Sequence, residues 1–296
     1  MAKEILTEDV DRIKELSIKV LGNADIDDIK RLGGLTNHTY KVTLQNGAQY
    51  VFRIPGEGTE ELICREDERV STKLACKLGI DSPMLYFGDN GEKVTLYIEN
   101  ARTMDAESLR EDKAIVDVAH VFRRLHTCGE NTGVPFEVFD MAKSYEDIIY
   151  SNNVSMFDDY EQVKEKIFRL KGEIDENGAV PTVPCHNDSL CENWVYSGDR
   201  LYLIDWEYAG MNDGMWDLAD VSIEAGYSKE NDELLLLSYF GQAPDELQRK
   251  RFIANKLYLD YLWSLWGKTR VPYDGDFMEQ YALERYLRLK KNLQEI

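Results

Sequence analysis

The chain has 296 residues, of which 43% are hydrophobic and 30% are charged, a composition typical of a globular protein with a buried core. Its 55 acidic residues outnumber its 35 basic residues and give a formal net charge of −20, which excludes nucleic acid and anionic membranes as expected partners. The sequence shows no signal peptide, no apolar run long enough to cross a bilayer and no Cys-x-x-Cys pair among its five cysteines. We therefore expect a cytoplasmic protein with reduced thiols and no zinc site.

The chain begins with a pattern typical of a helix, followed by a glycine-rich turn between two strands. We predict a helix over residues 7–21, capped by Thr7, and a strand–turn–strand unit over residues 29–42. Glycines let backbone amides approach phosphate oxygens, and polar side chains add donors. An ordinary turn is the alternative to a nucleotide-binding lid. The lid would be formed by Gly33, Gly34, Thr36 and Asn37.

A second hairpin follows directly. Residues 40–44 and 49–54 alternate around Asn46-Gly47, which is a strong hairpin signal. Arg53 ends the second strand at the place where a protein kinase has its phosphate-binding lysine. Arginine can perform the same electrostatic task with its planar fork of donors, although an exposed strand arginine is the alternative.

The next predicted helix runs from Thr59 to about Leu78 and has its buried stripe at helical spacing. Glu66 and Glu68 both lie on it. If this helix corresponds to the C-helix of a kinase, one of the two pairs with Arg53. We favour Glu68, but the sequence leaves Glu66 open.

Two further strands are predicted over residues 83–88 and 93–98. The segment 97–100, which includes Glu99, would form the edge strand and the hinge at which adenine binds. We therefore predict a β-rich nucleotide-binding lobe over residues 1–100. Residues 101–296 would form a larger, mainly helical lobe with the catalytic loop and the acceptor pocket.

The first clear helical pattern of the larger lobe ends at Cys128-Gly129 and carries His126 on its apolar stripe. A histidine in that position is more often a hydrogen-bonded core residue than a catalyst. We therefore give His126 a structural role.

The stretch around Asp188 carries the chemistry. Asp188 and Asn193 are five residues apart, as are the catalytic Asp and the magnesium-binding Asn of protein kinases. A predicted hairpin around Ser197-Gly198-Asp199 then returns the chain, so that Asp205 is delivered beside Asn193. Carboxylate and amide oxygens are ligands that Mg²⁺ prefers. His186 is expected to bind loop backbone rather than to catalyse.

The segment after Asp205 differs from a protein kinase. A helix begins almost at once, near Met215, with no long activation loop and no Ala-Pro-Glu motif. The platform that binds a polypeptide substrate is therefore missing, and a small-molecule acceptor is expected. Asp217, at the start of this helix, is predicted to brace the catalytic loop by accepting backbone donors.

The helix predicted over residues 251–266 is apolar on both of its sides, which indicates burial on two faces or one face in a pocket. Trp263 and Trp266 lie one turn apart on it. With Tyr208, Tyr273 and Tyr281 they could form an aromatic cage that binds quaternary ammonium through cation–π attraction. Core packing is the alternative.

The motif from His186 to Asn193, taken with residues 204–208, resembles the two signature motifs of the choline/ethanolamine kinases. These enzymes belong with the aminoglycoside phosphotransferases and share the protein-kinase-like fold. The likeness is greatest to bacterial choline kinases of phosphorylcholine-decoration pathways, and it spans nearly the whole chain. Residues 32–37, 123–126 and 263–266 also match. The resemblance thus implies an α+β, bilobal, protein-kinase-like fold.

The resemblance also implies roles for single residues. Asp188 would be the catalytic base, and the metal site would consist of Asn193, Asp205 and the supporting carboxylate of Glu207. Glu224 would offset the ammonium charge. Cys191 departs from the pattern, since proline is common there, but no functional group is lost. The residues implied to line the choline pocket are Tyr208, Trp263, Trp266 and Tyr281.

The sequence therefore predicts ATP- and Mg²⁺-dependent phosphorylation of choline. Ethanolamine kinase and aminoglycoside kinase remain alternatives that differ in the acceptor. A nucleotide-binding module without catalysis is the alternative from another class. The sequence leaves the oligomeric state open.

Overall fold

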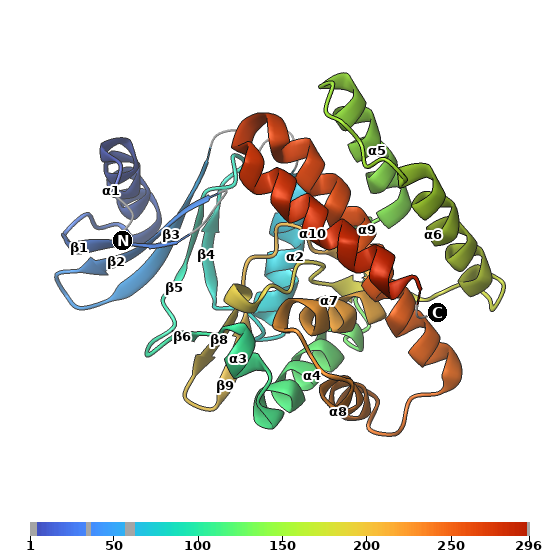
Figure 1. The fold of residues 1–296 in the computed structure, drawn as a ribbon. Coiled ribbons are helices and arrows are strands. Elements are labelled where there is room, and N and C mark those ends of the chain that lie inside the picture. The colour runs from blue at the N-terminus through green and yellow to red at the C-terminus, as the bar shows by residue number, and fades with distance from the viewer. Residues whose placement is uncertain (1–4, 34–36, 57–62, 295–296) are drawn as a thin grey trace. The chain divides into compact units, whose positions relative to one another are not determined.

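The computed structural model describes residues 5–33, 37–56 and 63–294, and the chain divides into two compact units (Figure 1). The first unit comprises Met1–Met104 and Glu192–Ala209, and the second comprises Asp105–Cys191 and Gly210–Ile296. The lobe boundary that the sequence places at residue 100 stays a prediction. The first segment of the first unit ends at Met104, close to that position, and the unit also includes a later segment, Glu192–Ala209.

The first unit is built on a five-stranded antiparallel sheet with the order β1-β2-β3-β5-β4. Helix α1 packs on this sheet, and Ile13 and Leu16 of the helix share a core with strand residues such as Tyr40, Val42 and Phe52. The elements are α1 (Thr7–Leu21), β1 (Ile26–Gly33), β2 (Asn37–Leu44), β3 (Gln49–Pro55), α2 (Arg65–Lys77), β4 (Met84–Phe87), β5 (Lys93–Leu96) and β6 (Arg102–Thr103).

Two of the expected helix and strand ends need correction, and a third lies outside the described residues. Helix α1 does begin at Thr7, but its N-cap residue is Leu6 and no side chain caps it, so the prediction of Thr7 as the cap is wrong. The start predicted for α2 at Thr59 lies outside the described residues, and the described helix begins at Arg65. Residues 97–100 are not a strand. Strand β5 ends at Leu96, and Asn100 has a left-handed φ of 51°, which an extended strand cannot contain.

A second, three-stranded sheet in the first unit has the order β6-β8-β9. Strands β8 (Trp194–Ser197) and β9 (Arg200–Leu203) form the hairpin predicted from the sequence, with Gly198 in its turn at a φ of 57°. The short helix η1 (Cys191–Asn193) precedes it. The amide of Ile204 donates to the carbonyl of Asn193 at 2.9 Å. The hairpin thus delivers Asp205 beside Asn193, as predicted.

The second unit is mainly helical. A two-stranded antiparallel sheet pairs Cys185 of β7 with Gly210 of β10 and so anchors the start of the loop that contains Asp188. At Gly267 of α9, a Cβ would lie 2.8 Å from the Cδ1 atom of Tyr281, so only glycine lets α10 approach α9 this closely. The elements are α3 (Ala106–Leu109), α4 (Asp112–His126), α5 (Val138–Ser151), α6 (Tyr160–Asp175), β7 (Thr182–Cys185), β10 (Gly210–Asp213), α7 (Met215–Ala225), α8 (Lys229–Phe240), α9 (Glu246–Asp274) and α10 (Asp276–Asn292).

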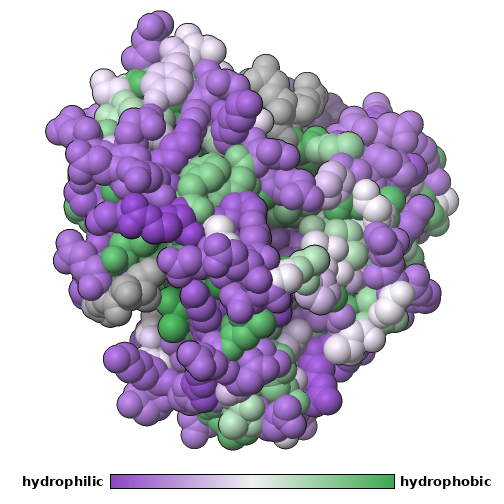
Figure 2. All heavy atoms as spheres, turned by 90° about the vertical axis from the view of Figure 1, so that its right-hand side faces the viewer, coloured by the Kyte–Doolittle hydropathy of each residue, from purple (hydrophilic) through white to green (hydrophobic). Residues whose placement is uncertain are grey.

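The surface is largely polar. On the face shown in Figure 2, hydrophilic side chains predominate and separate the hydrophobic side chains into small patches. Within the described parts of the chain, no helix combines the length and the apolar character needed to cross a membrane.

The turn between β4 and β5 depends on one glycine. Gly91 has a φ of 89°, and a Cβ there would lie 2.4 Å from Nε of Arg65. Its carbonyl oxygen accepts a hydrogen bond from Nη2 of Arg53 at 2.9 Å. The turn therefore packs directly against the side chains of two arginines.

We expect Gly91→Ala to lower the free energy of unfolding by more than Gly47→Ala does. Gly47 also has a positive φ, 83°, but a Cβ there would meet nothing within 4 Å. Backbone strain alone predicts a loss of about 1–2 kcal/mol for Gly47→Ala, whereas the clash with Arg65 adds a further 1–3 kcal/mol, roughly, to Gly91→Ala. Urea denaturation of both variants measures the difference, and equal losses would contradict the packing argument.

Candidate active site

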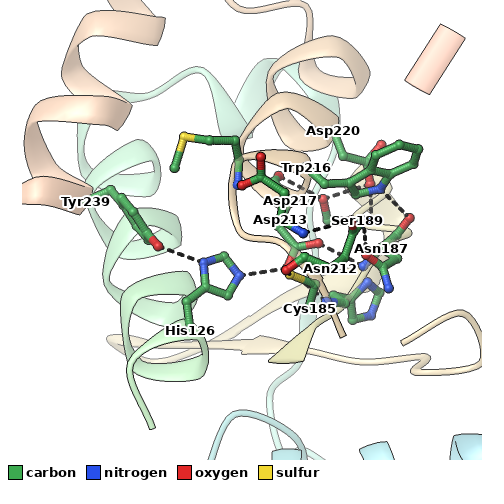
Figure 3. A network of polar contacts seen from close by, with 12 residues as sticks. His126, Cys185, Asn187, Ser189, Asn212, Asp213, Trp216, Asp217, Asp220 and Tyr239 are labelled. Carbon is green, nitrogen blue, oxygen red and sulfur yellow. Dashed lines mark hydrogen bonds and ion pairs between the residues drawn. The ribbon is translucent and has the colours of Figure 1, made fainter. Parts of the chain in front are cut away.

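The loop that contains Asp188 is held by the carboxylate of Asp217 (Figure 3). The backbone amides of His186 and Asn187 donate to Oδ2 and Oδ1 of Asp217, each at 2.8 Å. Asp217 lies in the first turn of α7 and is fully buried. A buried carboxylate needs hydrogen-bond donors, and the two successive loop amides supply them. The predicted brace is confirmed.

The residues on both sides of Asp188 are anchored separately. Asp220 accepts hydrogen bonds from the amide and, at 3.0 Å, from the hydroxyl of Ser189. Asn187 has a left-handed φ of 67°, and its carbonyl oxygen accepts a hydrogen bond from the indole of Trp216 at 3.1 Å. A strained backbone conformation persists only where its surroundings fix it. Asp188 therefore projects from a fixed backbone, and it remains partly exposed.

The two histidines near this loop have structural roles. Nδ1 of His186 accepts a hydrogen bond from the amide of Asp188 at 3.3 Å. His126 is buried, and its ring nitrogens lie 3.0 Å from Oδ2 of Asp217 and 3.0 Å from the hydroxyl of Tyr239. His126, Asp217 and Cys185 place metal-ligand atoms within 4.8 Å of one another. Both carboxylate oxygens of Asp217 already accept hydrogen bonds from the loop. We therefore assign these three residues to the brace of the loop and not to a metal site.

The first unit contains a buried cluster of charges centred on Glu68. Nη1 of Arg53 lies 2.5 Å from Oε1 of Glu68, Nη1 of Arg65 lies 2.8 Å from Oε2, and Nζ of Lys93 lies 3.5 Å from Oε1. Glu66 instead pairs with Arg69 on the exposed face of α2. The structure therefore places Glu68, and not Glu66, against Arg53.

The sequence did not single out Lys93. Its position follows from strand register, because Arg53 and Lys93 are directly opposite each other in β3 and β5 and opposed side chains project from the same face of a sheet. Burial alone would raise the pKa of Glu68, but the charges of Lys93 and Arg53 lower it to about 2. Glu68 is therefore ionised at neutral pH.

The carboxylates that the sequence predicts as metal ligands lie beside this cluster. Oδ1 of Asp205 lies 3.5 Å from Nη1 of Arg53, and Asp205 has a left-handed φ of 68°. Oε2 of Glu207 accepts a hydrogen bond from Nδ2 of Asn37 at 2.8 Å and lies 3.7 Å from Nη1 of Arg65. Burial, together with the charge of Asp205, raises the pKa of Glu207 to about 7.

The remaining predicted nucleotide-binding residues are placed only in part. Gly33 is the last residue of β1, and Gly34 and Thr36 lie outside the described residues. The carbonyl oxygen of Glu99 accepts a hydrogen bond from the hydroxyl of Ser197 at 2.7 Å, and Glu99 is exposed. Asn193 is buried.

Three of the predicted acceptor residues form an aromatic cluster in the second unit. The rings of Trp263 and Trp266 meet edge to face with centroids 6.0 Å apart, and Trp266 and Tyr281 do the same at 5.8 Å. The indole nitrogen of Trp266 is buried and has no hydrogen-bond partner. A core tryptophan normally satisfies this group, so the nitrogen of Trp266 is a donor open to a ligand. Tyr208 belongs to the first unit.

Glu224 forms an ion pair with Arg285. Its Oε1 accepts a hydrogen bond from Nη2 of Arg285 at 2.7 Å, and the guanidinium carbon of Arg285 lies 4.7 Å from the ring centroid of Tyr281. Arg285 is not among the residues predicted from the sequence. The available signal was that Tyr281 and Arg285 are four residues apart on one helix, where their side chains are neighbours.

Comparison with known proteins gives a consistent result. Residues 29–285 match the family model described as choline/ethanolamine kinase. The protein LicA of Haemophilus influenzae is 31% identical over 90% of this chain and 79% of its own length. Human ethanolamine kinase 2 is 27% identical over 86% of this chain and 72% of its own. The crystal structure of choline kinase LicA from Streptococcus pneumoniae matches with a TM-score of 0.84 and 32% identity, covering 98% of this chain and all of the other.

The charge cluster leads to a prediction about stability in acid. Because the pKa of Glu68 falls from 4.5 to about 2 on folding, its stabilising effect is complete above about pH 4.5 and is lost as the pH falls towards 2. We expect Glu68→Gln to reduce the free energy of unfolding at pH 7 by about 3 kcal/mol. In urea titrations, the difference in the free energy of unfolding between wild type and this variant should narrow steadily from pH 5 to pH 3.

Glu66→Gln is the matched control, because Glu66 lies on the same helix in an exposed ion pair. Such a pair contributes at most about 1 kcal/mol. A Glu68→Gln variant that behaved like this control at every pH would contradict the assigned role of Glu68.

Proposed function

The chain belongs to the choline/ethanolamine kinase family, and we propose that it catalyses the ATP- and Mg²⁺-dependent phosphorylation of choline to phosphocholine in the cytoplasm. Its fold is the kinase-like fold of the solved choline kinase. The observation that carries the choice of choline is the aromatic cluster of Trp263, Trp266 and Tyr281. Aromatic rings that meet edge to face favour an organic cation that cannot donate hydrogen bonds.

Asp188 is the proposed base. In the reaction, the hydroxyl oxygen of choline forms a bond to the γ-phosphorus of ATP, the bond from that phosphorus to the β–γ bridging oxygen breaks, and the hydroxyl proton passes to Asp188. In phosphoryl transfer, positioning and electrostatic stabilisation supply most of the catalysis. The anchoring of His186, Asn187 and Ser189 supports this role, because it keeps the Asp188 backbone fixed during the reaction.

The proposed magnesium ligands are Asn193 and Asp205, with Glu207 in support. Their donor set consists of carboxylate and amide oxygens, which fits a hard cation. Oδ1 of Asp205 accepts no hydrogen bond and lies 3.5 Å from Nη1 of Arg53, so its lone pairs are open to a cation. When bound, magnesium supplies positive charge that neutralises the phosphate oxygens.

The proposed nucleotide site lies in the first unit. Arg53, held by Glu68, would bind phosphate oxygens with its fork of donors. Backbone amides at Gly33 and Gly34, with Thr36 and Asn37, would contribute the lid, and the hinge at Glu99 would hold the adenine. Asn37 also holds Glu207 at 2.8 Å, which supports a link between the lid and the metal site.

The proposed acceptor site in the second unit consists of the aromatic cluster and Glu224. Tyr208, which belongs to the first unit, stays a prediction from the sequence. Ethanolamine is the alternative acceptor, since a human ethanolamine kinase is among the relatives. The orphaned indole nitrogen of Trp266 supports a polar ligand in contact with the cluster, because the hydroxyl of either alcohol could accept its hydrogen bond.

The central test is an ADP-release assay with ATP and Mg²⁺ that compares choline, ethanolamine and kanamycin at equal concentration. Choline should be preferred, and Asp188→Asn should lower kcat by roughly 10²–10⁴-fold, the usual contribution of a general base. Asp199→Asn, which removes an exposed acid in the β8–β9 turn, is the matched control and should behave as wild type. Near-normal turnover by Asp188→Asn would refute the base, and turnover of kanamycin alone would refute the acceptor.

The aromatic cluster leads to a second test. Trp266→Ala should raise the KM for choline by roughly 2–30-fold, the range expected for loss of one cation–π contact, while the KM for ATP stays unchanged. Trp266→Phe keeps an aromatic ring and should raise the KM for choline less. If steady-state kinetics show the same KM for choline in wild type and Trp266→Ala, the cluster is core packing.

A further inference from the structure

Glu224, which the proposed function assigns to the substrate cation, already has a cationic partner in the chain. Arg285 donates from Nη2 to Oε1 of Glu224 at 2.7 Å, and only 8% of its side chain is exposed. The pair joins α7 to α10, and both residues belong to the second unit. One oxygen of the Glu224 carboxylate is therefore occupied, and the charge of that carboxylate is balanced.

The same guanidinium also contacts the aromatic cluster. Its central carbon lies 4.7 Å from the ring centroid of Tyr281, and Nη1 lies 3.8 Å from Oδ1 of the buried Asp260. Arg285 thus makes both contacts that an organic cation would make here, one with a carboxylate and one with a ring face. The side chain fixes Glu224 and Tyr281 in relation to each other.

The occupied carboxylate affects two acceptors differently. Ethanolamine carries three N–H donors on its ammonium group, and each donor that loses water needs a new acceptor, because an unsatisfied polar group is costly to bury. Choline carries three methyl groups instead and has no such donors. A carboxylate oxygen that already accepts a hydrogen bond from Arg285 has one lone pair fewer for an ammonium donor of ethanolamine. Choline loses only electrostatic attraction, because it has no donor that needs this lone pair.

We propose that Arg285 is the residue that makes this site discriminate choline from ethanolamine, by occupying Glu224 and thereby withholding an acceptor from the primary ammonium. The inference rests on the proposed function, since it presumes that Glu224 and the aromatic cluster receive the substrate cation. Arg285 is a positioning residue, because it acts through Glu224 and Tyr281.

The test measures kcat/KM for choline and for ethanolamine and uses their ratio. In Arg285→Met, which keeps length and removes the donors, the ratio of choline to ethanolamine should fall at least about tenfold, the effect of one hydrogen bond to a charged group. In a Glu224→Gln background the same substitution should leave the ratio unchanged, since the acceptor that it frees is no longer a carboxylate.

Two further variants test whether a change in the ratio comes from Arg285 itself and not from a general loss of charge or of the fold. Lys291→Met removes an exposed cation of α10 that has no described contact with Glu224, Asp260 or Tyr281, so the ratio should stay at the wild-type value. Arg285→Lys keeps the charge and the fold but loses the planar fork, and it should shift the ratio in the same direction by less. This variant decides the question if Arg285→Met fails to fold.

The outcomes separate the two proposals. A wild-type enzyme that prefers choline, with a ratio that stays the same in Arg285→Met or in Arg285→Lys, overturns the role of Arg285 and leaves the proposed function standing. A wild-type enzyme that prefers ethanolamine overturns both. A fall in the ratio that is equally large in Lys291→Met would show a general effect of charge on α10 and also overturns the inference.

Discussion

The carboxylate of Asp217 fixes the segment on which the second unit's chemistry depends. It accepts hydrogen bonds from two successive backbone amides and contacts a buried histidine. The loop therefore cannot shift without leaving the buried carboxylate unsatisfied. Asp220 and Glu224 follow at spacings of three and four and therefore share a face of α7. One helix thus holds the residue after the proposed base and also the carboxylate of the proposed acceptor site.

In the first unit a single buried carboxylate is also held by several partners, but these partners are cations instead of backbone amides. Three cations converge on the single carboxylate of Glu68, and Asp205 and Glu207 lie at the margin of the cluster. Buried charges persist only with partners, so each of these side chains limits the conformations of the others. A site assembled in this way has its electrostatic environment in place before any ligand binds, which is the condition for catalysis by preorganised charge.

Features set by turn chemistry or by a motif of fixed spacing could be predicted from the sequence. Features set by packing between distant elements could not. The hairpin at Asn46-Gly47 and the brace at Asp217 were predicted because turn chemistry and a motif at fixed spacing determine them. Lys93 and Arg285 were missed because their roles depend on strand register and on helix–helix packing. The supposed cap at Thr7 and the strand at residues 97–100 failed at element ends, where local preference is weakest.

Neither unit is one continuous stretch of chain. A fragment that ended at Met104 would contain β6 without its partner β8, the carbonyl of Ile80 without the amide of Leu203, and Arg53 without Asp205. The first unit is therefore not a portable module that recombination could move as a single gene segment. A gene fragment that encodes the whole first unit must also encode Asp105–Cys191, which lies between its two parts.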